Sequence, residues 1–143
     1  MRRTRVLFLC TGNSCRSQMA EGWARHLAGD RWEVRSAGTH PAGLNARAVR
    51  VMAEAGVDIS WHHAKALDPE LLQWADRIIT LCDNARDRCP ATPPHIQRLH
   101  WPVEDPVWAW GSEEEVLAVF RRVRDEIRKR IEALLEAEPR DPG

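Results

Sequence analysis

A short apolar segment near the N-terminus, Arg5-Val-Leu-Phe-Leu9, narrows the possible folds of this 143-residue chain more than any other feature. Its apolar residues fill both faces of a strand, which is typical of a central strand in a parallel sheet. Parallel neighbours need long crossover connections, usually helices. The next segment fits, because apolar residues recur at helical spacing from Ser17 and Gly29 follows as a helix end. The N-terminal third therefore predicts a βα unit.

The rest of the chain continues this alternation. Helix starts are indicated by Asn45, by Asp68-Pro69-Glu70 and by a capping box of Ser112 with Glu115. Three more strands are expected at Trp32–Ser36, Ile78–Leu81 and Gln97–Trp101. The pattern predicts an α/β fold, a three-layer sandwich in which a four-stranded parallel sheet carries helices on both faces. We expect one catalytic domain over residues 1–138 and a frayed tail over 139–143.

The charge balance limits the classes of partner. The 21 Lys and Arg residues equal the 21 Asp and Glu residues, and this zero net charge disfavours a nucleic-acid binder. Residues 1–50 nevertheless carry nine Arg and three acidic residues, a net charge of +6. An anion site is therefore expected in the first third.

The apolar runs limit the expected location of the chain. They are too short to cross a membrane, and the run after Arg2, Arg3 and Arg5 is too short for a signal peptide. We therefore expect a cytoplasmic protein with no membrane partner. A monomer is a separate expectation.

The segment after the first strand has the composition of an oxyanion-binding loop. It contains Cys10, Thr11, Gly12, Asn13, Ser14, Cys15 and Arg16, and Ser17 opens the helix. Backbone N–H groups of such a loop, the helix dipole and the Arg16 guanidinium can all contact a tetrahedral anion. Gly12 and Asn13 are residues that tolerate unusual backbone conformations. These contacts and a Ser17 hydrogen bond also favour a nucleophilic Cys10 thiolate.

Cys10 and Arg16 taken alone fit a plainer interpretation, a buried strand-end cysteine and a solvent-exposed arginine. Their combination with Gly12, Asn13 and Ser17 at suitable offsets favours the anion site. The segment from Cys10 to Trp23 resembles the signature of the low-molecular-weight protein tyrosine phosphatase superfamily, specifically its arsenate reductase branch. The resemblance extends over nearly the whole chain, through the motifs Ser36-Ala-Gly38, Thr80-Leu-Cys82, Cys89-Pro90, His100-Trp101 and Asp105-Pro106.

Two further cysteines, Cys82 and Cys89, distinguish a reductase from a phosphatase. A reductase must supply two electrons, and a dithiol that becomes a disulfide supplies them. The resemblance implies a relay in which Cys10 forms a covalent adduct with arsenate, Cys82 attacks the Cys10 sulfur, and Cys89 then attacks Cys82. It further implies thioredoxin as the partner that reduces the Cys82–Cys89 disulfide, and phosphate is expected as a competing ligand. We expect no cofactor and no metal. The polar spacer between the two cysteines lacks apolar anchors, which would let it rearrange.

Other interpretations of the cysteines stay open. Cys82 suits a small buried residue at a strand end, whereas Cys89 lies among charged residues. Cys82 and Cys89 with His95 and His100 have a spacing wider than that of structural zinc sites. Cys15 is as well explained by packing as by any catalytic role.

Asp105 and Lys65 have two interpretations each. The resemblance implies that Asp105 is the general acid, although Asp-Pro is also a common turn starter. Some relatives bind potassium through residues that match Asn13, Glu21 and Ser36 plus a further acid, and Lys65 stands at the position of that acid. Lys65 is then either a replacement for the cation or a solvated surface residue.

Two functions compete with thioredoxin-coupled arsenate reduction. The first is a low-molecular-weight phosphatase that uses Cys10, Arg16 and Asp105, and the second is an anion-binding redox sensor. The chain has no tyrosine, and Val107-Trp108 stands where such phosphatases often carry tyrosines, which counts against a tyrosine-phosphatase specialist. The three cysteines favour the reductase.

Overall fold

The computed structural model describes residues 3–138, so the tail expected at 139–143 lies outside the described residues. Its centre is a four-stranded, fully parallel sheet in the order β2-β1-β3-β4. The strands are β1 (Thr4–Cys10), β2 (Trp32–Gly38), β3 (Arg77–Thr80) and β4 (Gln97–His100). All four expected strands are present, with ends shifted by one or two residues.

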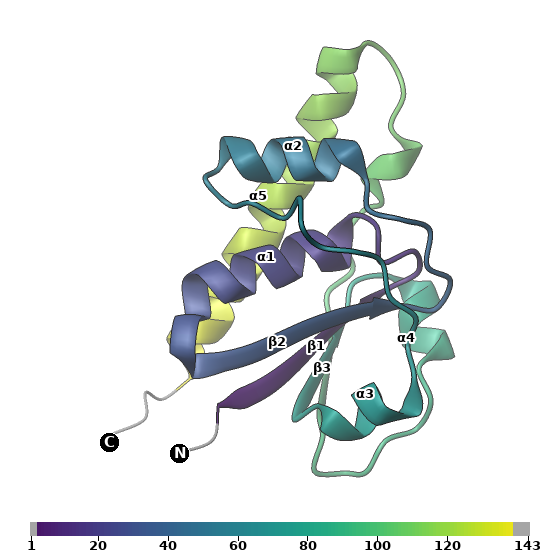
Figure 1. Ribbon diagram of the computed structural model, residues 1–143, viewed down its shortest axis with the longest axis vertical. Coiled ribbons are helices and arrows are strands. Elements are labelled where there is room, and N and C mark those ends of the chain that lie inside the picture. Colours follow the sequence, from purple (N-terminus) through teal and green to yellow (C-terminus); the bar gives the residue numbers. More distant parts are fainter. Residues whose placement is uncertain (1–2, 139–143) are drawn as a thin grey trace.

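Helices cover both faces of this sheet, which confirms the three-layer prediction (Figure 1). One face carries α1 (Arg16–Ala28) and α5 (Glu113–Ala137), with α2 (Ala46–Glu54) packed on both. On the other face, the described part of the chain places two short helices, α3 (Pro69–Trp74) and α4 (Asp83–Arg88). Two 3-10 turns, η1 (Gly29–Arg31) and η2 (Pro106–Trp108), complete the regular structure of the described residues.

Local sequence signals account for the helix boundaries. The side chain of Asn45 caps α2, and the Asp68 carboxylate accepts from the backbone N–H of Leu71 at the start of α3. Ser112 and Glu115 form the expected reciprocal capping box of α5. Gly29 ends α1 with a φ of 54°, a conformation that favours glycine.

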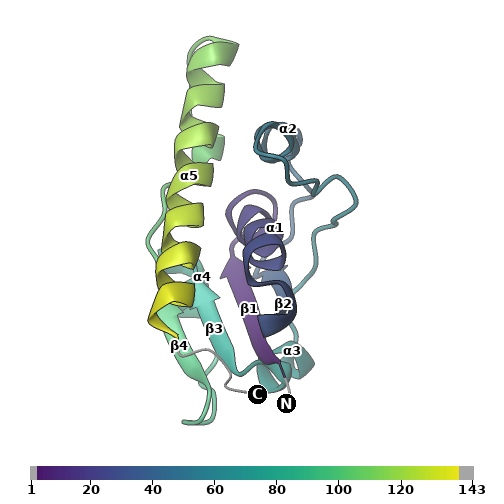
Figure 2. The ribbon, with the colours of Figure 1, turned by 90° about the vertical axis from the view of Figure 1, so that its left-hand side faces the viewer.

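The order of the strands fixes where a ligand site can form. β1 lies between β2 and β3, so the chain passes from β1 to one side and later returns to the other. In open parallel sheets, ligands bind at the carboxyl ends of the strands near this reversal. Figure 2 shows that β1 and β3 run side by side in the same direction, so their carboxyl ends lie at one edge. None of the helices within residues 3–138 is both long and apolar enough to cross a membrane.

Candidate active site

Three loops meet at the carboxyl edge of the sheet and bring together the residues singled out from the sequence. Cys10 ends β1, Cys82 follows β3, and Asp105 follows β4. Arg16 connects all three loops, because its guanidinium contacts the carbonyls of Leu81 and Val103 and the carboxylate of Asp105. The site is therefore assembled by strand order, from segments up to 95 residues apart in sequence.

The loop over residues 10–16 turns its carbonyl oxygens away from the prospective anion site. The carbonyls of Thr11, Gly12 and Ser14 accept hydrogen bonds from backbone N–H groups of the segment 40–45, at 2.8 to 3.1 Å. The C=O and N–H groups of a peptide point in opposite directions, so the loop N–H groups face the other way, beside the start of α1. That helix begins at Arg16 without a side-chain cap, so its first N–H groups are also available to an anion.

Asn13 fixes the shape of this loop. Its φ of 47° lies in the left-handed region, and its side chain is fully buried. The amide nitrogen donates to the hydroxyls of Ser17 and Ser36 at 2.7 and 3.0 Å, while the oxygen accepts from the Lys65 N–H and from Gln18. Four side-chain hydrogen bonds therefore hold a conformation that costs a non-glycine residue roughly 1–2 kcal/mol.

Gly12 does not need the backbone freedom expected of it from the sequence. Its φ is outside the left-handed region, and an added Cβ would meet its nearest neighbours, Ala42 and Ser14, at an ordinary 3.4 Å. Within the loop, the left-handed conformation is found at Asn13. The Asn13 side chain stabilises this conformation through hydrogen bonds that a glycine could not make.

The Cys10 sulfur lies 2.8 Å from the Ser17 hydroxyl oxygen. Because Ser17 also accepts from Asn13, its own proton is directed toward the Cys10 sulfur. The chain of contacts continues from Asn13 to Ser36, whose hydroxyl donates to the buried Glu21 carboxylate at 2.5 Å. The nucleophile predicted from sequence is thus connected to β2 and α1 by a polar network of buried side chains.

Asp105 fits both interpretations drawn from the sequence. One carboxylate oxygen accepts from the Val107 N–H at 3.0 Å, which makes Asp105 the turn starter of η2. The other oxygen lies 3.3 Å from the Arg16 guanidinium, which directs the carboxylate toward the anion loop. The turn therefore positions the group that the resemblance assigns as the acid.

Cys82 lies against the anion loop, and Cys89 lies at the far end of a helix. The Cys82 sulfur is 3.3 Å from the Thr11 hydroxyl and accepts from the Ala85 N–H as the cap of α4, whose other end is Cys89. The prediction that the spacer between the two cysteines lacks apolar anchors is wrong. Residues 83–88 form α4, and Ala85 is completely buried. A six-residue polar helix has little intrinsic stability, so this packing decides its formation.

The zinc and potassium alternatives find little support in the site geometry. Within residues 3–138, no three His, Cys, Asp or Glu side chains converge as a metal site, and His100 instead contacts Thr80 and Asp83. At the suggested potassium position, the Glu21 carboxylate already has two cationic partners, Arg25 at 2.8 Å and Lys65 at 3.9 Å. These residues do not fit an additional cation, and burial lowers the pKa of Lys65 despite the opposing effect of Glu21.

Two supports of the loop were missed in the sequence. The buried Gln18 donates to the Asn13 carbonyl, and its oxygen contacts the ring of the buried His62. Gly38 at the end of β2 leaves room for the loop, since a Cβ there would lie 2.6 Å from the Thr11 carbonyl oxygen. The motif Ser36-Ala-Gly38 was the available signal for the glycine, whereas nothing local marks Gln18 or His62.

Cys15 is buried within the anion loop and stays a thiol. Burial raises the pKa of Cys15 to about 12, above the usual 9.0, and the nearby Asp105 raises it further while Ser14 and Arg16 oppose the shift. This protonation state suits packing better than nucleophilic chemistry.

The Cys15 pKa predicts a loss of stability at high pH. Between pH 9.0 and about 12 the folded chain keeps a proton that the unfolded chain releases, so rising pH favours unfolding. We expect the free energy of unfolding of the native chain to fall by roughly 2–3 kcal/mol more than that of Cys15→Ala between about pH 8 and about pH 11. Urea unfolding at both pH values measures this difference, and an equal fall in the two proteins would contradict it.

Comparison with known proteins places the chain in a family. Residues 5–141 match the model of the low molecular weight phosphotyrosine protein phosphatase family. An arsenate reductase of Bacillus licheniformis is 55% identical over 136 residues, which cover 95% of this chain and 98% of that protein.

Two solved structures agree with this assignment. An arsenate reductase in a phosphate-binding state has a TM-score of 0.75 at 33% identity, covering 93% of this chain and 97% of its own. A thioredoxin-dependent arsenate reductase of Corynebacterium glutamicum has a TM-score of 0.74 at 29% identity, covering 95% of this chain and 64% of its own. The chain belongs to the low molecular weight phosphotyrosine protein phosphatase family.

Proposed function

We propose that this protein reduces arsenate to arsenite and that a disulfide relay supplies the electrons. The observation that carries the proposal is the position of Cys82, whose sulfur lies 3.3 Å from the Thr11 hydroxyl of the anion loop. A hydrolytic phosphatase needs no thiol there. The arsenate reductase of Bacillus licheniformis and the phosphate-binding arsenate reductase structure support a tetrahedral oxyanion as substrate.

The first step forms a covalent adduct at Cys10. The Cys10 thiolate attacks arsenic(V), and one arsenate oxygen leaves as water after protonation by Asp105, which Arg16 holds at 3.3 Å. Loop N–H groups and the Arg16 guanidinium stabilise the charge on the other oxygens.

The second step transfers two electrons to arsenic. The Cys82 thiolate attacks the Cys10 sulfur, the sulfur–arsenic bond breaks with its electron pair on arsenic, and arsenite leaves with a Cys10–Cys82 disulfide behind. Cys89 then attacks Cys82, which releases Cys10 as a thiolate and forms the Cys82–Cys89 disulfide. An external dithiol restores the enzyme, and the thioredoxin-dependent relative from Corynebacterium glutamicum supports thioredoxin in this role.

The relay predicts that Cys82 and Cys89 are both required. Purified protein is given arsenate, thioredoxin, thioredoxin reductase and NADPH, and arsenate-dependent NADPH consumption is followed. We expect turnover in the native chain and a loss of roughly 1000-fold or more in Cys82→Ser and in Cys89→Ser, because neither variant can form the final disulfide. Turnover without Cys89 at the native rate would contradict the relay.

A phosphatase activity is the second candidate, since Cys10, Arg16 and Asp105 form a complete nucleophile, anion clamp and acid. Hydrolysis of p-nitrophenyl phosphate by the same proteins separates the candidates. Hydrolysis that survives in Cys82→Ser and Cys89→Ser, with no arsenate reduction in the native chain, would establish the phosphatase. Absence of both activities in a folded protein that binds phosphate would leave the redox sensor.

A further inference from the structure

The helix α4 keeps the two exchanging cysteines of the proposed relay apart. Cys82 caps its start and Cys89 caps its end. A helical rise of 1.5 Å per residue separates their Cα atoms by roughly 10 Å, whereas a disulfide requires Cα atoms within about 7 Å. One end of α4 must therefore detach before Cys89 can reach Cys82.

Strand β4 contacts both ends of this helix through two side chains on one face. A 2.7 Å hydrogen bond joins Nδ1 of His100 to the Thr80 hydroxyl. Nε2 of His100 lies 3.0 Å from the carboxylate of Asp83, the first residue of α4. Two residues earlier on β4, the Arg98 guanidinium donates to the Pro90 carbonyl at 2.9 Å and to the Cys89 carbonyl at 3.5 Å. Residues two apart on a strand share a face, so β4 holds α4 at two points.

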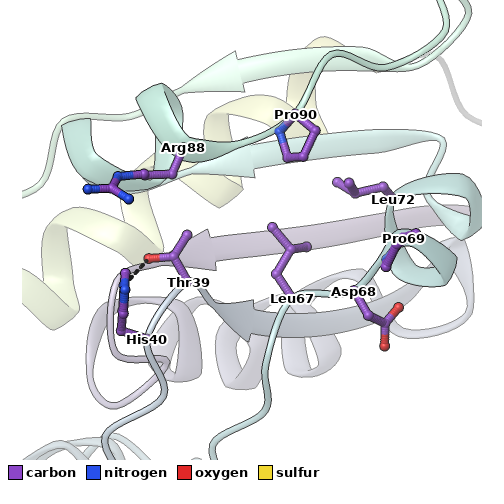
Figure 3. A pocket seen from close by; sticks show the side chains of 8 residues that line it. All are labelled: Thr39, His40, Leu67, Asp68, Pro69, Leu72, Arg88 and Pro90. Atoms are coloured by element: carbon purple, nitrogen blue, oxygen red, sulfur yellow. Dashed lines mark hydrogen bonds between the residues drawn. The ribbon is translucent and has the colours of Figure 1, made fainter.

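The two ends differ in how easily they can detach. The first end carries Cys82, which must stay beside the anion loop for the preceding exchange, and Ala85 anchors it in the core. The Cys89 end borders a cavity of about 360 Å³ (Figure 3). Arg88 and Pro90 line this cavity together with the apolar side chains of Leu67 and Leu72. The residues on either side of Cys89 therefore border open space, while Arg98 donates hydrogen bonds to the carbonyls of Cys89 and Pro90.

We infer that Arg98 is a positioning residue for the second exchange of the relay. Its contacts retain Cys89 at the end of α4 in the reduced resting protein, and its charge stabilises the Cys89 thiolate there, before that end of α4 detaches and the thiolate attacks Cys82. The assignment rests on the proposed relay for its purpose, but the contacts with Cys89 exist in the reduced resting protein. In the exchange itself the Cys89–Cys82 bond forms, the Cys82–Cys10 bond breaks, and Cys10 leaves as a thiolate, so no external oxidant or reductant is needed.

The electrostatics of Cys89 agree with this role. Cys89 is buried, and burial raises the pKa of its thiol, while the charge of Arg98 and a hydrogen bond from it lower that pKa. Arg98 thus counteracts the main obstacle to thiolate formation at this position. A lysine would supply the charge without the planar pair of N–H donors that contacts two successive carbonyls.

The test measures the pH profile of Cys89 alkylation by iodoacetamide in the reduced full-length protein, with each cysteine quantified by peptide mass spectrometry. In Arg98→Gln we expect the pH of half-maximal alkylation to rise by roughly half a unit, and the plateau rate at high pH to rise about threefold as the end of α4 opens more often. Arg98→Lys should restore the pH midpoint and leave the plateau raised. Arg130→Gln removes the same charge from α5, where Arg130 pairs with Glu126, and should match the native chain in both.

The outcomes separate this inference from the proposed function. An unmoved pH midpoint in Arg98→Gln overturns the thiolate role, and an unmoved plateau overturns the retaining role, whether or not arsenate is reduced. An equal shift in Arg130→Gln would also overturn the assignment, because the effect would then be one of net charge. If the Arg98 variants behave as expected while the native chain fails to reduce arsenate, the proposed function fails and the assignment of Arg98 to Cys89 stands.

Discussion

Replacing Gly38 with alanine is expected to lower kcat/KM for arsenate by roughly 100-fold, because it displaces the anion loop by a fraction of an ångström to an ångström. The new Cβ would lie 2.6 Å from the Thr11 carbonyl oxygen and 2.8 Å from the Asn13 nitrogen, distances at which backbone atoms must move. Gly38 itself has little freedom to yield, since its N–H and carbonyl are hydrogen-bonded to Lys65 and Leu67. The loop must therefore shift, and its N–H groups lose their alignment with the oxyanion.

Gly22→Ala provides a matched control for the steric clash. Its Cβ would also meet an atom at 2.6 Å, but this atom is the Cγ2 of Ile59 in the apolar contact between α1 and the segment after α2. Both variants should lose about 1–3 kcal/mol of stability from overpacking, while Gly22→Ala keeps its kcat/KM. Steady-state kinetics, with urea unfolding and phosphate protection of Cys10 from alkylation, measure the two effects separately. Equal losses of activity in both variants would attribute the Gly38 effect to stability instead of loop position.

The fold was predictable from the sequence wherever local rules decide the structure. Segment 5–9 has the two apolar faces typical of a central parallel strand, and Asn45, Asp68 and Ser112 mark helix starts through hydrogen bonds made within four residues. The helix α4 was not predictable in this way. Its five polar residues and Ala85 form a helix because Ala85 packs in the core and β4 contacts both ends, and these contacts arise only in the assembled sheet.

The site was predictable to the extent that strand ends determine it. Cys10, Cys82 and Asp105 each follow a strand, so a parallel sheet brings them to one edge, and the structure does so. Gly38 and Gln18 were not recognised, because their importance comes from the approach of β2 and α1 to the loop across the fold. Asp105 shows why two interpretations stayed open, since the same carboxylate starts a turn and pairs with Arg16.

Replacing Arg16 with lysine is expected to lower kcat/KM for arsenate by roughly 100- to 1000-fold, the typical cost of removing a preorganised oxyanion donor. The Arg16 side chain is buried, and its two terminal nitrogens contact the Val103 carbonyl at 3.0 Å and Asp105 at 3.3 Å. A lysine ammonium keeps the positive charge, but it cannot make both of these contacts and also bind two substrate oxygens. Asp105 and the segment before Cys82 would then no longer contact the same side chain.

The matched control is Arg47→Lys, which alters another two-pronged guanidinium contact, that of Arg47 with Glu113 between α2 and α5. This pair is exposed, and the Arg47 side chain pairs with Glu113 instead of with a residue of the anion loop, so its variant should keep the native kcat/KM and lose little stability. Steady-state kinetics of arsenate reduction and of p-nitrophenyl phosphate hydrolysis should show parallel losses in Arg16→Lys, because the anion clamp precedes the point at which the two chemistries diverge. Activity within about threefold of the native chain would show that the loop N–H groups alone hold the oxyanion and that Arg16 serves only to join the three loops.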